Sequence, residues 1–382
     1  MQCIMNSYNM CETLNLISES EINPQDVSMI YYNHTLRQSI HSVKTEIDNH
    51  VDAWERNKKY MNPYEFINTR YDSRTPMVCS YEPISRAFFK MIEILNNYEF
   101  NFPPTMTSFH LAEGPGGFIE ALNYTRQNNC DTYYGMTLMN DEKDTPKWNK
   151  FEKYLNDNKH IIIQYGADGT GNLYHIENLE YVKHRYENSI DFITADGGFD
   201  YSIDFNKQEE NSLNLVFSEI CFALMMQKKG GSFVLKVFDL LSSASFELVY
   251  LLTYLYNDVF IMKPSTSRPA NSEKYIVCLN FRMVPNLNKI KNKILEIFPS
   301  VHANTFNRFL NIPSNNVFID KLKEINSIFG QCQIETIIST LNYISNTNRQ
   351  DSYDNKRSYI NKCIKWCQKN KLPINSCHYS LS

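Results

Sequence analysis

In the middle of the chain, short apolar runs alternate with longer stretches in which apolar residues recur every three or four positions. The short runs predict one strand that ends at Leu111, just before a glycine-rich turn. They predict further strands at residues 132–138, 160–165, 189–195, 232–237, 259–262 and 275–281. The longer stretches predict helices at residues 84–96, 209–227 and 244–256. Strands that alternate with helices form parallel βαβ units, so we expect a doubly wound α/β sheet.

Helical spacing also marks both flanks of this block. Residues 1–75 contain no glycine, and their apolar positions follow one helix face at Leu36, Ile40, Val43, Ile47, Val51 and Trp54. After Pro285 the helical stretches are residues 287–297, 318–329 and 334–344. The sequence therefore predicts an N-terminal helical extension at residues 1–75, an α/β domain at 76–285 and a helical C-terminal region at 286–382.

One turn stands out between the first predicted strand of the block and its helix. In residues 109–118 an apolar run ends at Glu113, turns through Gly114, Gly116 and Gly117, and opens a helix whose first N–H groups can face a ligand. The phosphate-loop pattern is absent, and Ile119 occupies the third glycine position of the dinucleotide fingerprint. By itself, the turn fits either a nucleotide-like ligand or an ordinary strand-to-helix connection.

Composition narrows the setting but not the partner. Charged residues make up 21% of the chain and its net charge is −4, so any nucleic-acid groove must be local. Ten scattered cysteines, no secretory leader and no long apolar run favour an intracellular protein without a membrane span, in the cytoplasm or nucleus. The richness in Asn, Ile, Lys and Tyr suggests an AT-rich genome, such as that of a virus or protist; a viral protein would work at a cytoplasmic replication site or in the virion.

A metal site is not expected. Four residues near the C-terminus could supply ligands, but they lack the paired short spacings of zinc sites: Cys363, Cys367, Cys377 and His378.

Isolated charges fall where the predicted strands end. These residues are Glu113, Asp168, Asp196 and Lys236. Lys236 lies within an apolar run typical of a central strand, so its ammonium must pair with an acid or extend to water. Ligands bind beyond the carboxyl ends of parallel strands, which makes this edge the candidate site.

Four motifs in this order resemble the FtsJ-type (RrmJ-like) ribose 2′-O-methyltransferases, and most closely the eukaryotic and viral mRNA cap methyltransferases of that group, including the Adrift type. The motifs are Ala112-Glu113-Gly114-Pro115-Gly116-Gly117-Phe118, Thr194-Ala195-Asp196-Gly197-Gly198-Phe199, Phe233-Val234-Leu235-Lys236 and Thr266-Ser267-Arg268-Pro269-Ala270-Asn271-Ser272-Glu273-Lys274-Tyr275. The resemblance covers roughly residues 80–282. It implies a Rossmann-like class I S-adenosylmethionine-dependent methyltransferase sheet, here with N- and C-terminal helical extensions.

The resemblance also implies site residues. A Lys-Asp-Lys-Glu tetrad would consist of Lys90, Asp196, Lys236 and Glu273, with Lys90 carried by the loosest match. The S-adenosylmethionine site would comprise Glu113, Gly114, Pro115, Gly116, Gly117, Phe118, Asp168 and Asp196. The usual acid after the second strand is replaced by Gly135-Met136-Thr137-Leu138, text that the cap-methyltransferase relatives share. RNA would lie beside Arg86, Lys263, Ser267 and Arg268.

The chemistry of methyl transfer agrees with these residue types. A ribose hydroxyl becomes a good nucleophile only as its proton is removed, and Lys236 can accept that proton only when neutral, a form that burial and a nearby Lys90 favour. Asp196 and Glu273 would orient the two lysines.

Three functions remain open from the sequence. The first is S-adenosylmethionine-dependent 2′-O-methylation of the first or second transcribed nucleotide of capped mRNA. The second is methylation of ribosomal or transfer RNA, and the third is a catalytically silent RNA- or partner-binding subunit. The terminal helical regions could serve as an RNA track or bind a protein partner.

Overall fold

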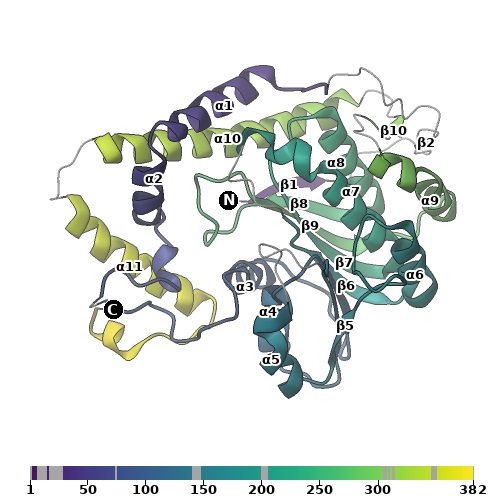
Figure 1. Cartoon of the computed structure of the whole chain (residues 1–382), viewed down its shortest axis with the longest axis horizontal. Helices are drawn as coiled ribbons and strands as arrows, with labels where there is room; N and C mark the ends of the chain where they lie inside the picture. Colours follow the sequence, from purple (N-terminus) through teal and green to yellow (C-terminus); the bar gives the residue numbers. More distant parts are fainter. Residues whose placement is uncertain are drawn as a thin grey trace.

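The fold is built on one mixed sheet. The structure, a computed structural model, describes residues 2–6, 15–16, 29–73, 75–139, 148–198, 205–303, 308, 310–311, 315–345 and 351–381. Within these residues, eight strands form the sheet in the order β1-β8-β9-β7-β6-β3-β4-β5. Figure 1 shows this sheet at the centre of the molecule, with helices on both faces. The expected α/β architecture is thereby confirmed.

The six central and outer strands that the sequence predicts between residues 107 and 262 all run in one direction. They are β3 (Thr107–Leu111), β4 (Thr132–Met136), β5 (Ile161–Gln164), β6 (Ile190–Ala195), β7 (Gln227–Val237) and β8 (Tyr256–Met262). A bulge between the first and later pairs of β6 and β7 lets β7 begin several residues before the predicted strand. Their carboxyl ends therefore share one edge.

The last predicted strand departs from the parallel pattern. Strand β9 (Lys274–Phe281) lies between β7 and β8 and runs antiparallel to both. The loop that joins β8 to β9 contains no helix, and parallel neighbours require a crossover of a dozen or more residues. The chain consequently turns back, and the first residue of β9 meets the edge at which the other strands end.

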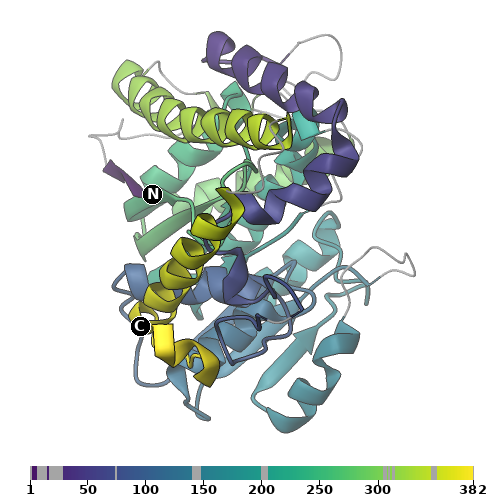
Figure 2. The ribbon, with the colours of Figure 1, turned by 90° about the vertical axis from the view of Figure 1, so that its left-hand side faces the viewer.

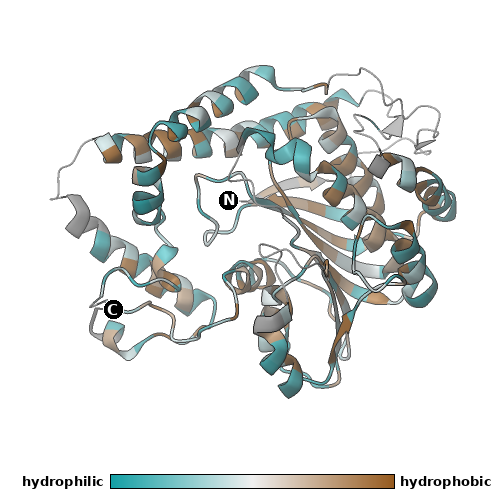
Figure 3. Ribbon diagram, in the orientation of Figure 1, coloured by the Kyte–Doolittle hydropathy of each residue, from teal (hydrophilic) through white to brown (hydrophobic). Residues whose placement is uncertain are grey.

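Two hydrophobic cores cover the two faces. One core packs α6 (Ile176–Tyr186), α7 (Gln208–Met226), α8 (Ser243–Leu255) and α9 (Leu287–Ala303) on the sheet. The other packs α3 (Ala87–Asn97), α4 (Gly117–Arg126) and α11 (Asp351–Lys369) on the opposite face, with α5 (Glu152–Asp157) beside them. Figure 3 shows the corresponding brown, apolar strands beneath helices whose outer sides are teal. Alternate residues of β7 enter different cores, since Leu235 belongs to the first and Val234 to the second.

The N-terminal region contains helices as expected, but also a strand that its pattern did not predict. Strand β1 (Gln2–Asn6) pairs antiparallel with β8 at the edge of the sheet, and β2 (Asn15–Leu16) pairs with β10 (Leu310–Asn311). Helix α1 (His34–Asp48) begins after Asn33, whose side chain accepts a hydrogen bond from the Leu36 N–H. Helix α2 (Val51–Asn57) follows after a break, and this break leaves Val51 exposed rather than on the buried face.

The C-terminal helices return to the N-terminal ones. Helix α10 (Asn316–Ser345) crosses α1, and Figures 1 and 2 show the two side by side along one side of the molecule. The crossing is close at Gly330, because a Cβ there would lie 2.8 Å from Cδ1 of Leu36 and 3.1 Å from Cδ1 of Ile40. The proposed three-part division of the chain is not tested by these contacts and stays a prediction.

We expect Gly330→Val to lower the free energy of unfolding by about 1–3 kcal/mol, because the added methyl groups crowd the α1–α10 crossing. Valine is the better helix former of the two, so a loss of stability would report crowding. Denaturant unfolding measures the change, and Ile338→Val, at an exposed position of α10, is the matched control. Equal stability of Gly330→Val and the wild-type chain would contradict this packing.

Candidate active site

The topology brings four charged residues to one point of the sheet edge. Asp196 follows the last residue of β6, and β6 pairs with β7 so that Ala195 lies opposite Leu235. Because β9 is antiparallel, Lys236 lies opposite Tyr275, and Glu273 directly precedes β9. Lys90 reaches the same point from α3. The structure thus brings together all four residues predicted from the motifs.

Lys236 points to the face of the sheet covered by α3, the same face as Val234. Its Nζ donates a hydrogen bond to the backbone carbonyl of Asp196 at 3.0 Å and lies 3.5 Å from Oδ1 of that carboxylate. The same Oδ1 accepts the hydroxyl of Tyr275 at 2.8 Å. Asp196 is therefore held from two sides, and it orients the Lys236 ammonium.

Lys90 and Glu273 form the second pair. The Lys90 Nζ lies 2.8 Å from Oε2 of Glu273, and both side chains are largely shielded from solvent. Burial alone would raise the pKa of Glu273, but the charges of Lys90 and Lys236 outweigh it and hold that pKa at about 2. Glu273 is ionised at neutral pH and interacts electrostatically with both lysines.

Two further residues belong to this cluster, and only one of them, Gly198, lies in a motif that the sequence singled out. Glu219, on α7, accepts the Gly197 N–H at 3.1 Å, and burial raises its pKa to about 8 despite the nearby Lys236. Gly198 lets the lysine approach, since a Cβ there would lie 3.0 Å from the Lys236 Nζ. The motif containing Gly197 and Gly198 was visible in the sequence. The partner on α7 was not, because Glu219 lies 22 residues from Gly197 along the chain, within an apolar stretch of that helix.

The glycine-rich turn lies next to this cluster. The Glu113 side chain is buried, and its Oε1 accepts the N–H of Phe118 at 2.6 Å, while Oε2 has no hydrogen-bond partner among the described residues. Burial, and then the charge of Asp196, raise the pKa of Glu113 well above its usual range. Gly116 has φ +110°, and a Cβ there would strike the ring of Phe151 at 2.8 Å. Gly116 is thus required by the turn and by the packing of that ring.

Asp168 lies apart from the four charged residues, in the loop after β5. Its carboxylate caps this loop by accepting the N–H and hydroxyl of Thr170, both at 2.8 Å, and it contacts His175 and Asn178. Burial opposes its ionisation, but these hydrogen bonds, that of His175 foremost, lower its pKa. The structure places Asp168 beyond a strand end, as its position in the sequence predicts.

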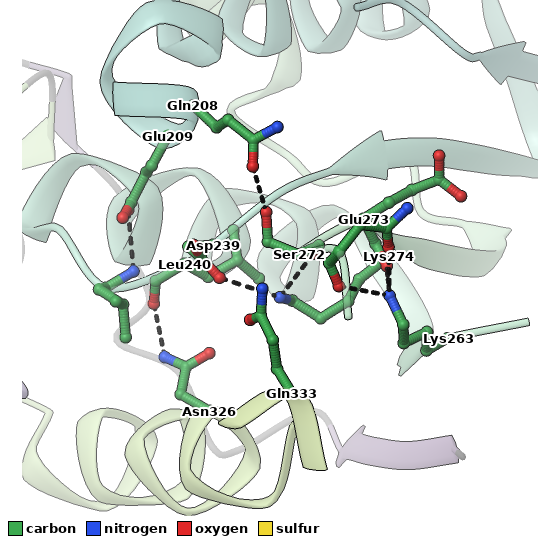
Figure 4. A network of polar contacts seen from close by, with 12 residues as sticks. Gln208, Glu209, Asp239, Leu240, Lys263, Ser272, Glu273, Lys274, Asn326 and Gln333 are labelled. Carbon is green, nitrogen blue, oxygen red and sulfur yellow. Dashed lines mark hydrogen bonds and ion pairs between the residues drawn. The ribbon is translucent and has the colours of Figure 1, made fainter. Parts of the chain in front are cut away.

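The loop that carries Glu273, residues 263–273, is held by helices that precede and follow it in the sequence. Figure 4 shows Gln208 of α7 accepting the Ser272 hydroxyl and Gln333 of α10 approaching the loop. The Gln333 amide donates to the Ala270 carbonyl at 3.0 Å, and Glu93 of α3 accepts the Ser265 N–H at 2.8 Å. These contacts hold the backbone that precedes Glu273.

Two of the four predicted RNA-binding residues are engaged inside this loop. The Lys263 Nζ donates to the backbone carbonyls of Asn271 and Glu273, and burial lowers its pKa to about 7. Ser267 is buried and donates to the Asn271 side chain. These contacts favour a structural role for both side chains, and their assignment to RNA stays a prediction.

The other two, Arg86 and Arg268, lie at the surface and share one buried carboxylate, that of Glu65. Arg268 also lines a cavity of about 190 Å³ between α1, α2, α10 and the loop. Trp54 lies in the wall of this cavity, together with Lys58 and the Glu55 carboxylate that pairs with it. The cavity next to the Glu273 loop is therefore lined by charges of both signs and by one aromatic ring.

Metal-ligand clusters and membrane-spanning helices are both missing from the described residues. Within these ranges, no group of three His, Cys, Asp or Glu side chains could hold a metal ion. Nor does any helix in the part of the chain that the structure describes have the length and apolar character needed to cross a membrane.

Comparisons with known proteins agree with the motifs. A family model described as FtsJ-like methyltransferase matches residues 83–281, which is just over half of the chain. A Drosophila melanogaster protein named cap-specific mRNA (nucleoside-2′-O-)-methyltransferase 2 is 29% identical over 289 residues, covering 68% of this chain and 39% of that protein. The chain therefore spans well under half the length of this relative.

Relatives also occur in protists and viruses. Cap-specific mRNA (nucleoside-2′-O-)-methyltransferase 1 of Trypanosoma cruzi is 32% identical over 237 residues, covering 58% of this chain and 61% of that protein. An African swine fever virus protein named "Probable methyltransferase EP424R" is 28% identical over 284 residues, covering 68% of this chain and 65% of that protein.

The buried acid on α7 gives a pH-dependent prediction. In the unfolded chain Glu219 ionises near pH 4.5, whereas in the folded protein it keeps its proton to about pH 8. Folded-state stability is thus lost as pH rises between these values. Glu219→Gln cannot ionise, so its stability relative to wild type should increase by more than about 1 kcal/mol from pH 5 to pH 8. Denaturant unfolding at both pH values tests this, with exposed Glu180→Gln on α6 as control. A difference that does not change with pH would contradict the assignment.

Proposed function

The chain belongs to the FtsJ-like methyltransferase family, and we propose that it is an S-adenosylmethionine-dependent RNA ribose 2′-O-methyltransferase. We further propose that its substrate is the first or second transcribed nucleotide of capped mRNA. The observation that carries the proposal is the pairing of Lys90 with Glu273 and of Lys236 with Asp196 at one sheet edge. Two lysines and two acids in this arrangement suit removal of a proton from a hydroxyl group.

The two pairs suit different tasks. Lys90 and Glu273 make the shorter ion pair, at 2.8 Å, so Lys90 serves as a fixed positive charge. Lys236 lies farther from the carboxylate of Asp196, at 3.5 Å. In the proposed reaction Lys236, in its neutral form, accepts the proton of the ribose 2′-hydroxyl while the oxygen attacks. Asp196 and Tyr275 keep the lysine aimed at that oxygen.

The neighbouring carboxyl groups fit this role. Burial raises the pKa of Glu219 and, together with Asp196, that of Glu113. With a pKa of about 8, Glu219 is largely protonated at neutral pH and does not stabilise the charged form of Lys236 as a carboxylate would.

The turn at Glu113 fits S-adenosylmethionine. When bound, this cofactor supplies an electrophilic methyl group on a sulfonium. The Oε2 atom of Glu113, buried and without a partner among the described residues, is an acceptor suited to the amino group of its methionine part. Gly114, Pro115, Gly116, Gly117 and Phe118 would form the floor, with Asp196 beside it and Asp168 toward the adenine.

We propose capped mRNA as the substrate, and not another RNA, because several relatives carry the name cap-specific mRNA methyltransferase. Methylation of ribosomal or transfer RNA is the alternative substrate assignment. A silent binding subunit is disfavoured by the four charged side chains, which are all present and paired. A protein partner for the terminal helical regions stays a prediction.

We expect Lys236→Ala to reduce methyl transfer by at least about a thousandfold, as expected for loss of a general base acting on a poor nucleophile, while binding of S-adenosylhomocysteine changes little. Labelled methyl transfer and calorimetric titration measure the two effects. Lys228→Ala is the matched control, because Lys228 lies on the same strand at its opposite, exposed end. Near-normal turnover by Lys236→Ala would exclude Lys236 as the base.

The substrate assignment is tested with short RNAs that differ only at the 5′ end. We expect methyl transfer to capped RNA and little transfer to the same RNA with a 5′-triphosphate or to ribosomal RNA fragments. Nuclease mapping of the labelled product then identifies the first or second nucleotide. Equal labelling of capped and uncapped RNA would favour the alternative substrates.

A further inference from the structure

We propose that Arg86 and Arg268, held by the carboxylate of Glu65, bind one backbone phosphate of the substrate RNA next to the ribose that is methylated. The inference rests on the proposed function, because it assigns a contact to the RNA strand that enters the site. Its new element is Glu65, a positioning residue in the N-terminal region, outside the part of the chain that the family model matches.

Both arginines grip the same carboxylate with two hydrogen bonds each. Arg86 donates from its two terminal nitrogens at 3.0 and 3.1 Å, and Arg268 donates from Nε and one terminal nitrogen at 3.1 and 2.7 Å. Glu65 is buried with 3% of its side chain exposed, whereas the arginine side chains are 37% and 31% exposed. The acid is therefore inside and the two cations face solvent.

The two arginines stabilise the ionised form of the Glu65 carboxylate. Burial would raise the pKa of Glu65, but hydrogen bonds and charge from the two arginines lower it to about 2. Asn62 donates a further hydrogen bond to it at 2.8 Å. Glu65 is ionised at neutral pH and fixes both guanidinium planes.

Arg86, Arg268 and Glu65, here called the trio, can still bind an anion. A guanidinium has five N–H donors, and each arginine uses two of them on Glu65, which leaves three per arginine. One negative charge between two positive charges leaves a net positive charge at the surface. Planar, oriented guanidinium groups suit two-pronged recognition of a phosphate.

Another arginine in the protein, Arg126, also binds a buried carboxylate and shows what a purely structural contact looks like. Arg126 binds the buried Asp131, its other hydrogen bonds go to the backbone carbonyls of Pro103 and Pro104, and its guanidinium lies over the ring of Phe102. In contrast, every guanidinium hydrogen bond that the described residues show for Arg86 and Arg268 goes to Glu65. Their remaining N–H groups have no hydrogen-bond partner among the described residues, and about a third of each side chain is exposed.

The position of the trio fits a phosphate beside the reacting ribose. Arg86 precedes α3 and lies one helical turn, about 5 Å along the axis, from Lys90. Arg268 lies in the loop that ends at Glu273. Lys90 and Glu273 pair with each other, so both arginines are linked by a short piece of backbone to the proposed catalytic pair.

The test replaces single phosphates of a capped RNA with neutral methylphosphonate, one linkage at a time around the methylated nucleotide. We expect wild-type kcat/KM to fall by about tenfold or more at one linkage, as for loss of a charge-assisted contact. The double variant Arg86→Met/Arg268→Met should be similarly slow on natural RNA and lose less than about twofold further at that linkage. Equal losses in both proteins at every linkage would overturn the proposal.

Glu65→Gln separates positioning from charge. If only the net charge matters, removing the negative charge of Glu65 should strengthen RNA binding. If Glu65 aligns the two arginines, weakening its hydrogen bonds to them should lower kcat/KM. We expect the lower kcat/KM, by about tenfold, together with reduced sensitivity to the critical methylphosphonate. Wild-type kcat/KM in this variant would contradict the role of Glu65. If Glu65→Gln fails to fold, the arginine variants and the modified RNAs still decide the phosphate contact.

Failure of the two proposals is distinguishable. If the wild-type chain methylates no RNA, the proposed function fails, and the phosphate contact is then judged from RNA binding as a function of salt. Loss of one phosphate contact reduces the slope of log K against log salt by about 0.7 for a single strand. The arginine double variant should show this reduction and Lys228→Ala should not; an unchanged slope in the double variant would overturn the phosphate site.

Discussion

The site depends on the cost of burying charge. Lysine and carboxylate side chains leave water only when partners repay the loss of hydration, and the sheet edge supplies these partners in pairs. Lys236 could not stay within an apolar strand without Asp196 after the neighbouring strand, and Glu273 stays ionised because two lysines approach it. The reversal of β9 is what makes this possible, since an antiparallel strand brings its first residue to the edge at which the parallel strands end.

Helices outside the family match have a physical task within this arrangement. The loop before Glu273 contains no helix or strand, and it is held by side chains of α3 and α7, which lie inside the matched range, and of α10, which lies outside it. Asp239, just after β7, adds a buried connection, because it pairs with Lys44 of α1 and Lys274 of β9. Burial would raise the pKa of Asp239, but Lys44 and Lys274 hold it at about 2. The terminal helices therefore stabilise the backbone that places Glu273.

Local patterns predicted most of the fold and of the site, and the missing parts have a common cause. Strands β3 to β9 and helices α3, α7 and α8 follow from apolar spacing, whereas α5 and α6 were not predicted; the motifs led to Lys90, Asp196, Lys236 and Glu273. Strand β1, Glu65 and Glu219 were missed because each acts through a partner distant in the sequence. A single glutamate in an apolar stretch of a helix, such as Glu219, gives no sign of the glycine N–H that it will accept. Direction was also missed for β9, since apolar runs do not say which way a strand runs.

The asymmetry between the two lysine pairs agrees with the roles that we propose for them. A lysine that acts as a fixed charge gains from a close carboxylate, and Lys90 has one at 2.8 Å. A lysine that must accept a proton has to be neutral. A negative charge very near it would raise its pKa and favour the ammonium form. Asp196 lies farther away, at 3.5 Å, and also accepts the hydroxyl of Tyr275, while burial raises the pKa of Glu219 to about 8. The backbone carbonyl of Asp196, at 3.0 Å, orients Lys236 together with that carboxylate, and Gly198 leaves room for the ammonium group.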